Sequence, residues 1–244
     1  MKVLSDELRI NNRTINVRDA RPDDLDGVAV IDAQSFTSPW IRDALEPFIF
    51  SDDKNRFLLV AEVKTELKSY PLYKSAFELR AVLEENYSYP DEVTKTNPES
   101  CALVRSKLSQ HDVAGADQKS QEMSGASSLL GFIAVQVLVD VFEIQRIAVL
   151  PDVRNFGIGA LLMAEVMRRG EKMEAASIIL EVSASNHEAR RLYDSFGFKM
   201  VGRRKSYYAD TGEDAILMTA TPPFLLKKTS DICLENNCRV KESK

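Results

Sequence analysis

The sequence predicts one α/β domain of mixed α+β type, in which helices flank a mixed, mostly antiparallel sheet. Two observations indicate this fold. First, apolar runs over residues 129–139 and 141–149 meet so tightly near Asp140 that they are expected to form an antiparallel hairpin. Second, residues 141–182 have the pattern of strand, helix and strand, and this segment is long enough for a parallel crossover. The two strands of the crossover should therefore lie side by side in the sheet.

The elements before the hairpin follow from the spacing of apolar residues. Residues 14–18 alternate like a short strand. A helix over residues 25–33 follows a proline and two aspartates, which are residue types that favour a helix start. After a break at residues 38–40, a second short helix is expected over residues 44–48 and a strand over residues 57–63.

The elements after the hairpin are predicted from the same periodicities and from the glycine that ends the last helix. They are helices over residues 158–173 and 189–196 and strands over residues 177–182, 200–208 and 214–221.

A change of composition divides the chain. Residues 64–128 are rich in Ser, Glu, Asn and Lys and are predicted to be an insertion, poorly ordered or partly helical, in a single domain that spans residues 1–222. Residues 223–244 are expected to form a flexible C-terminal tail. The insertion joins two strands at the sheet edge that should also hold the functional cleft. It is either a lid over that cleft or a mobile loop without catalytic consequence.

Composition excludes several functional classes. The 244 residues carry a net charge of −5 and a pI near 5.3, which argues against direct binding of nucleic acid. The three cysteines, Cys101, Cys233 and Cys238, are too few for a disulfide framework or a zinc site, so we expect a reducing compartment and no metal. No apolar run approaches the roughly 18 residues of a membrane helix. The sequence therefore predicts a cytoplasmic protein without a membrane partner.

The strongest functional signal is the turn at residues 154–159, between a strand and a helix. Gly157 and Gly159 allow successive backbone N–H groups to converge on an anion at the positive end of the helix, and a nucleotide-like pyrophosphate would suit this place. The third glycine of a dinucleotide fingerprint is missing, and no P-loop string exists. Taken alone, the turn could simply cap a helix. Because ligands bind beyond the carboxyl ends of such strands, Glu181 is expected near this turn.

The blocks around this turn resemble the GNAT superfamily of acetyl-CoA-dependent N-acetyltransferases. The superfamily signature, [QR]-x-x-G-x-[GA] on a strand-to-helix turn, is matched by Arg154, Gly157 and Gly159. Within the superfamily, the chain is similar to ribosomal-protein-alanine N-acetyltransferases of the RimI type. The matching segments are residues 147–149, 180–186, 192–198, 207–208 and 213–216 and the pair Pro39-Trp40.

The resemblance implies a sheet whose central parallel pair splays apart at the acetyl-CoA site. It also implies that Glu181 is the general base, that Tyr193 is the general acid, and that Asn186 contacts the coenzyme. Asn186 could instead cap its helix. The residues expected to bind acetyl-CoA, as a cosubstrate, are Ile147, Ala148, Val149, Arg154, Asn155, Phe156, Gly157, Ile158, Gly159, Ala160 and Asn186.

The chemistry of acyl transfer agrees with these roles. A free α-amino group has a pKa of about 7.7 to 8.0 and is mostly charged at neutral pH, so a base such as Glu181 is needed. Tyr193 could protonate the departing thiolate. A solvated strand-end acid and an ordinary packing aromatic are the alternatives. No cysteine lies in these blocks, so we expect direct attack in a ternary complex.

The acceptor implied by the resemblance is a protein N-terminus, most specifically the N-terminal alanine of a small-subunit ribosomal protein. Residues 36–45 and 207–214 are expected to line its pocket. The alternatives are an acetyltransferase of lysine side chains or small-molecule amines, and a module that senses acetyl-CoA without catalysis. Ala160 departs from the family, since many relatives have a polar or basic residue there. One side-chain contact with a phosphate, and some cofactor affinity, could be missing.

Overall fold

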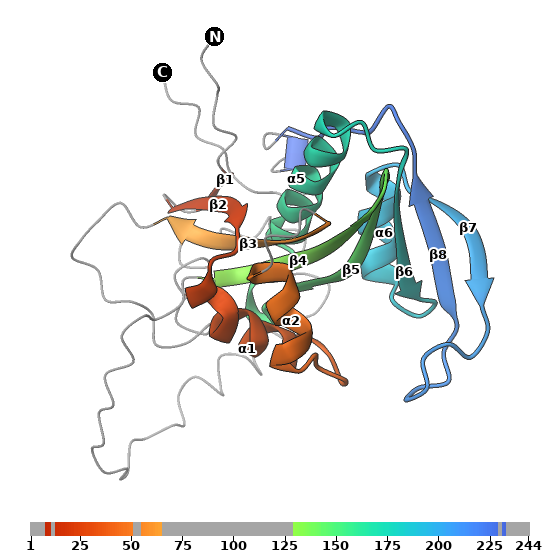
Figure 1. The fold of residues 1–244 in the computed structure, drawn as a ribbon, viewed down its shortest axis with the longest axis horizontal. Coiled ribbons are helices and arrows are strands. Elements are labelled where there is room, and N and C mark those ends of the chain that lie inside the picture. The colour runs from red at the N-terminus through yellow and green to blue at the C-terminus, as the bar shows by residue number, and fades with distance from the viewer. Residues whose placement is uncertain (1–7, 11–12, 51–54, 65–128, 229–230, 233–244) are drawn as a thin grey trace, which may run out of the picture.

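The computed structural model describes residues 8–10, 13–50, 55–64, 129–228 and 231–232. Within these residues an 8-stranded sheet has the order β1-β2-β3-β4-β5-β6-β8-β7 (Figure 1). The strands are β1 (Leu8–Ile10), β2 (Arg13–Asp19), β3 (Arg56–Lys64), β4 (Leu129–Leu138), β5 (Val141–Val149), β6 (Ser177–Ser183), β7 (Lys199–Arg204) and β8 (Ala215–Ala220). The helices are η1 (Pro22–Asp24), α1 (Leu25–Ser35), α2 (Arg42–Ile49), η2 (Pro151–Val153), α5 (Ile158–Lys172) and α6 (His187–Ser195).

The predicted mixed sheet is confirmed. All neighbouring strands are antiparallel except β5 and β6, which form the parallel pair of the predicted crossover. Pairing between β5 and β6 stops at Ile144 and Leu180, although the strands continue to Val149 and Ser183. The expected splay of the central pair is therefore present.

A bulge accompanies the splay. The register between β4 and β5 shifts between Ala134 and Val135, whose partners are Arg146 and Ile144, so Gln145 is the extra residue. A bulge bends the strand that contains it and increases its twist. This bend helps to carry the end of β5 away from β6.

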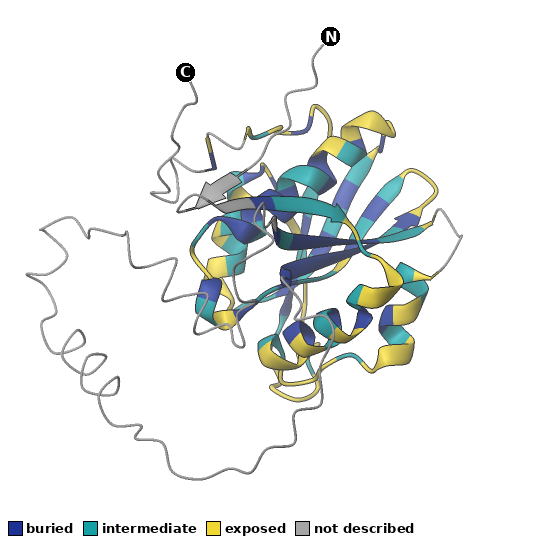
Figure 2. Ribbon diagram, turned by 90° about the vertical axis from the view of Figure 1, so that its left-hand side faces the viewer, coloured by how far each residue is buried: buried dark blue, intermediate teal, exposed yellow. Residues whose placement is uncertain are grey.

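Helices cover both faces of the sheet (Figure 1). Helices α1 and α2 contact β3, β4 and β5 on one face, and α5 packs on β2 to β6 on the other. Strands β4 and β5 lie between these layers; β4 is almost entirely buried, and β5 has buried residues among half-buried ones. The buried residues gather on the central strands of the sheet (Figure 2). The apolar stripes that predicted each helix thus meet in one hydrophobic core.

A glycine allows the backbones of β4 and β5 to approach closely beside the splay. A Cβ atom on Gly131 would lie 2.7 Å from the carbonyl oxygen of Ala148. This oxygen belongs to the backbone, so no side-chain rotation could relieve the clash. Gly131 pairs with Val149, the last residue of β5. The absence of a side chain here therefore sets the position of the strand end at which the functional turn begins.

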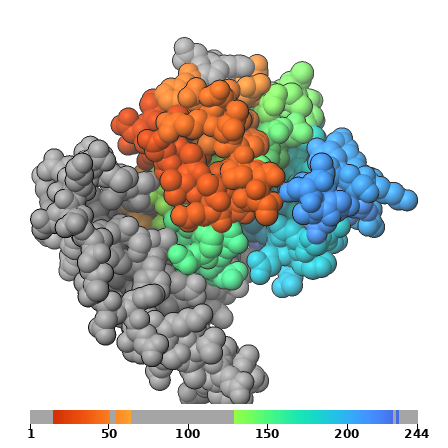
Figure 3. Space-filling model, turned by 90° about the horizontal axis from the view of Figure 1, so that it is seen from below, coloured from red at the N-terminus to blue at the C-terminus, as the bar shows by residue number. Residues whose placement is uncertain are grey.

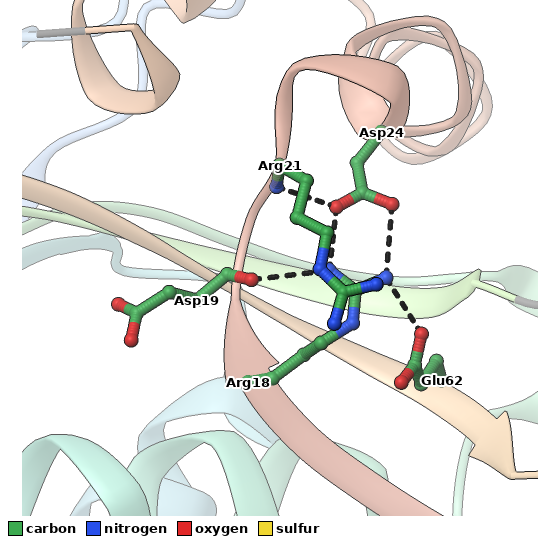
Figure 4. Close-up of polar contacts among 5 residues, drawn as sticks. All are labelled: Arg18, Asp19, Arg21, Asp24 and Glu62. Atoms are coloured by element: carbon green, nitrogen blue, oxygen red, sulfur yellow. Dashed lines mark hydrogen bonds and ion pairs between the residues drawn. The ribbon is translucent and has the colours of Figure 1, made fainter.

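An ion-pair cluster attaches the start of α1 to the sheet (Figure 4). Arg18 on β2 donates hydrogen bonds of 2.6 Å to Asp24 and 2.6 Å to Glu62 on β3. Asp24 also accepts the backbone N–H of Arg21 at 2.6 Å. Burial alone would raise the pKa of Asp24, but the hydrogen bonds from Arg18 and Arg21 outweigh burial and lower it. One of the acids predicted to begin this helix thus also orients it against the sheet.

Three details differ from the sequence predictions. Strand β1 was not expected, and β7 ends at Arg204 rather than at residue 208. Phe224 and Ile232, in the segment predicted as a flexible tail, are buried in the core. Phe224 approaches α5 beside Gly170, where a Cβ would lie 3.4 Å from its ring. The described part of the C-terminal segment therefore packs on the domain.

The predicted insertion, apart from Lys64 itself, lies outside the described residues. Its flanking strands, β3 and β4, are antiparallel neighbours, and Glu62 pairs with Leu129. Because Gly131 pairs with Val149, the insertion leaves and rejoins the sheet at the edge where β5 ends. None of the helices in the described part of the chain combines the length and apolar character of a membrane span.

Candidate active site

The glycine turn directs the start of α5 toward the end of β5. Gly157 is the N-cap of α5 with φ of 80°, a left-handed conformation, and Asn155 is also left-handed with φ of 66°. No side chain caps the first turn of this 15-residue helix. Its first backbone N–H groups and its dipole therefore suit an anion.

The side chains in this turn contribute to structure more than to an anion site. Arg154 donates from Nε to the carbonyl oxygen of Val149 at 3.1 Å. Phe156 packs against the core, and Ile158 and Ala160 are buried. A ligand at the turn would therefore meet their backbone atoms, and the side chain at position 160 faces the core.

The splay exposes one edge of β5 to a ligand. Residues 147–149 pair with β4 on one side, but among the described residues no strand pairs with their other side. Backbone N–H and C=O groups on that side are the polar groups that an extended amide-containing chain can pair with. This edge and the glycine turn are adjacent, because β5 runs directly into the turn.

Glu181 lies on β6 immediately after the last residue paired with β5. Its Oε1 atom is 2.7 Å from Nη1 of Arg204, and its side chain is 23% exposed. Tyr207 also forms a side-chain hydrogen bond with Glu181, and this bond raises the pKa of Tyr207. The carboxylate is thus accessible but is held by Arg204 at the end of β7 and by Tyr207 in the connection between β7 and β8.

Tyr193 lies on α6, the helix that follows β6. It is 5% exposed, and its ring centroid is 5.8 Å from that of Phe198. Burial, and secondarily the charge of Tyr208, raise the pKa of Tyr193 well above its ordinary value. Burial therefore keeps the side chain in its neutral phenol form, because a phenolate is costly away from water.

Tyr208 connects the two predicted catalytic residues electrostatically. Burial raises the pKa of Tyr208, and the charge of Glu181 raises it further. The same tyrosine contributes to the raised pKa of Tyr193. Glu181 and Tyr193, from consecutive elements, thus lie in one region around the connection between β7 and β8.

The two segments predicted to line the acceptor pocket contact each other. Thr37, in the connection between α1 and α2, donates to Asp210 at 3.1 Å, and Ser38 donates to the same carboxylate at 3.4 Å. In Figure 3 the orange surface of the N-terminal helices accordingly meets the blue surface of the C-terminal strands.

A buried ion pair beneath this contact was not predicted from the sequence. Asp32 on α1 is fully buried, and Nη1 of Arg146 is 2.8 Å from both of its carboxylate oxygens. Asp32 also accepts the backbone N–H of Trp40 at 2.6 Å. The guanidinium carbon of Arg146 lies 4.1 Å from the ring centroid of Phe36 and 4.6 Å from that of Trp40. The sequence does hold a signal for this pair, because an aspartate on the apolar stripe of a helix and an arginine in an apolar strand both need a buried partner.

Asn186 has one role that can be assigned. Its Oδ1 accepts the backbone N–H of Ala189 at 3.0 Å and so caps α6. Of the two alternatives left by the sequence, this contact establishes the cap. In the described part of the chain, no group of three or more His, Cys, Asp or Glu side chains could hold a metal ion.

Comparison with known proteins identifies the family. The profile of the acetyltransferase (GNAT) family matches residues 78–198. The ribosomal protein bS18-alanine N-acetyltransferase of Escherichia coli (strain K12) is 36% identical over 99 residues, which are 40% of this chain and 67% of that protein. The chain belongs to the GNAT acetyltransferase family.

Two further comparisons cover more of this chain. A protein of Bacillus subtilis (strain 168), named as a putative ribosomal protein bS18-alanine N-acetyltransferase, is 27% identical over 205 residues, 84% of this chain and 94% of its own. The crystal structure of the ribosomal-protein-S18-alanine N-acetyltransferase from Escherichia coli covers 85% of this chain and 93% of its own, with 20% identity and a TM-score of 0.54. This last comparison supports the GNAT fold, with its mixed sheet and flanking helices.

Proposed function

We propose that this GNAT enzyme transfers the acetyl group of acetyl-CoA to the N-terminal α-amine of a protein, and that its acceptor is the N-terminal alanine of a small-subunit ribosomal protein. The proposed reaction is supported by one observation: the glycine turn, the splayed end of β5 and the Glu181 carboxylate lie at the same edge of the sheet. The observation that carries the acceptor is the similarity to the bS18-alanine acetyltransferases.

The geometry fits acetyl-CoA. The uncapped first turn of α5 suits its diphosphate, which would be held by backbone N–H groups of residues 155–160. The free edge of residues 147–149 suits the amides of its pantetheine arm and the thioester oxygen. Because Oδ1 of Asn186 caps α6, only its amide nitrogen would serve the coenzyme. The bound group supplies the activated acetyl carbon.

Glu181 and Tyr193 would perform the two proton transfers. Glu181 accepts a proton from the acceptor ammonium, directly or through one water, which frees the nitrogen lone pair to attack the thioester carbon. The new C–N bond forms as the C–S bond breaks, and Tyr193 gives its proton to the sulfur. The nitrogen attacks as a neutral amine and then loses its second proton through water to the phenolate, which leaves a neutral amide and restores Tyr193. Glu181 releases the first proton to solvent. An ordinary tyrosine is already protonated at neutral pH, and the raised pKa of Tyr193 favours the return of a proton to the phenolate after its transfer to the sulfur.

The acceptor assignment is tested by incubating the protein with acetyl-CoA and peptides that begin with Ala, Ser or Met or that contain only an internal Lys as the free amine. Mass spectrometry would locate each added acetyl group. We expect modification of the α-amine, fastest for a peptide that copies the N-terminus of bS18. Polyamines and aminoglycosides serve as small-amine controls. Acetylation confined to internal lysine or to small amines would contradict the assignment, and folded protein that binds acetyl-CoA but transfers nothing would favour the sensor alternative.

The cofactor site is tested by replacing Gly159 with Val. A Cβ at this position would lie 3.4 Å from Leu192 and 3.9 Å from Val149, in the narrow space between α6 and the end of β5. We expect the dissociation constant for coenzyme A to rise about tenfold or more, a loss of about 1.4 kcal/mol or more. Calorimetry measures this change. Gly202→Val, on β7 with its nearest contact at 3.8 Å, is the matched control and should leave the affinity unchanged. An unchanged affinity for Gly159→Val would place the coenzyme elsewhere.

A further inference from the structure

Two consecutive arginines end β7 and make different ion pairs. Arg203 pairs with Asp214 at 2.5 Å, and Arg204 pairs with Glu181 at 2.7 Å. Their side chains are 55% and 54% exposed. Because successive side chains of a strand point to opposite faces, the two arginines have different surroundings although they are equally exposed. Only Arg204 contacts the carboxylate assigned as the base.

The contact between Arg204 and Glu181 joins two strands, β7 and β6, that are not neighbours in the sheet. Strand β8 lies between β6 and β7, and the guanidinium reaches over it to Oε1 of Glu181. Arg204 also lies over the ring of Tyr207, at 5.4 Å from its centroid, and Tyr207 is the second hydrogen-bond partner of the same carboxylate. One guanidinium and one phenol therefore hold Glu181 from the same side.

The connection that carries Tyr207 is itself attached to the sheet. Asp214 accepts the backbone N–H of Ser206 at 2.7 Å, and Glu213 accepts a short hydrogen bond from Ser183 on β6. The backbone N–H of Ala184 bonds to the carbonyl oxygen of Asp214 at 2.9 Å. These bonds attach both ends of the connection around Glu181, so its partners approach from a defined direction.

We propose that Arg204 is a positioning residue for acyl transfer, which holds one oxygen of Glu181 so that the carboxylate presents its other oxygen to the acceptor amine. This inference rests on the proposed function, in which Glu181 is the base. A glutamate side chain has three rotatable torsions and samples several rotamers when nothing holds it. A charge-assisted hydrogen bond selects one of them.

The exposure of Arg204 indicates whether losing its ion pair should affect stability or turnover. Ion pairs between exposed side chains contribute little to stability, because solvent screens them and holding two long side chains costs entropy. A small misplacement of a catalytic group, in contrast, can reduce the rate about 100-fold. Loss of Arg204 should therefore affect turnover far more than folding.

The test compares Arg204→Gln with Arg203→Gln in the full-length protein, with the N-terminal peptide that the wild type acetylates fastest. We expect Arg204→Gln to lower kcat about 10- to 100-fold, with the melting temperature and the affinity for coenzyme A unchanged. Arg203→Gln should stay within about twofold of wild type, as expected for an exposed arginine that does not contact the base. Arg204→Lys, which retains a cation, should recover part of the lost kcat.

A double variant separates action through Glu181 from a general effect. If Arg204 acts only by positioning the base, adding Arg204→Gln to Glu181→Gln should lower kcat no further. The inference is overturned if the two losses multiply, if Arg203→Gln is equally impaired, or if Arg204→Gln turns over like wild type while Glu181→Gln does not. Wild-type turnover by Glu181→Gln would instead remove the base assignment of the proposed function.

Discussion

Replacing Glu181 with Gln is expected to lower kcat for an N-terminal peptide by about 10² to 10⁴, the usual contribution of a general base. Glutamine retains the shape of the side chain and can still bond to Arg204 and Tyr207, but it cannot take a proton from the acceptor ammonium. The reaction would then depend on the fraction of amine that is already neutral. Raising the pH should therefore restore activity partly in the variant, because an α-amine loses its proton above about pH 8.

Three measurements make this result specific to catalysis. The melting temperature and the affinity for coenzyme A should match the wild type, since Glu181 is part of neither the core nor the glycine turn. Tyr193→Phe should also lower turnover while binding coenzyme A, because phenylalanine fills the same buried place without a proton to donate. Wild-type turnover by both variants with saturating acetyl-CoA would remove the proposed roles.

Replacing Arg146 with Met is expected to reduce the free energy of unfolding by about 3 to 5 kcal/mol, the cost of leaving one charge of a buried pair without its partner. Asp32 is fully buried and receives both Arg146 and the backbone of Trp40. Without the guanidinium, the carboxylate retains only the neutral donor. The stacking with Phe36 and Trp40 is lost as well. Urea unfolding monitored by circular dichroism measures the change.

A second Arg–Asp pair provides the matched control. Arg42 pairs with Asp26 on α1, but these side chains are 55% and 76% exposed, so Arg42→Met should cost no more than about 1 kcal/mol. Adding Asp32→Asn to Arg146→Met should recover part of the stability, because an amide leaves no buried charge and can still accept from Trp40. Equal losses for Arg146 and Arg42 would show that burial of the pair does not matter.

The Arg146 variant also has a functional expectation. The pair fixes residues 36–40, which contact Asp210 in the other segment predicted to line the acceptor pocket. Because the coenzyme turn is on the other side of β5, we expect the KM for peptide to rise while the affinity for coenzyme A is retained at temperatures where the variant is folded.

Local signals predicted most of the fold. Apolar patterns placed α1, α2, α5, α6 and strands β2 to β6 and β8 correctly, because most of these elements bury one regular face and β4 is buried along almost its whole length. Strand β7 was placed but extended too far, since its side chains are mostly exposed and no apolar alternation marks its end. The buried Phe224 and Ile232 follow two prolines in a polar segment, where little else indicates packing.

The sequence by itself determined the elements, the crossover, the glycine turn and the two residues proposed for proton transfer, because these depend on neighbours in the chain or on a motif. The tertiary structure decided which distant side chains meet: Arg204 with Glu181, Arg146 with Asp32, and Asp210 with Thr37 and Ser38. These contacts arise from the bulge and splay of β5 and from the strand order, which places β8 between β6 and β7. Polar pairs of this kind show no periodicity along the chain, because the packing of the sheet and its helices determines which distant side chains come into contact.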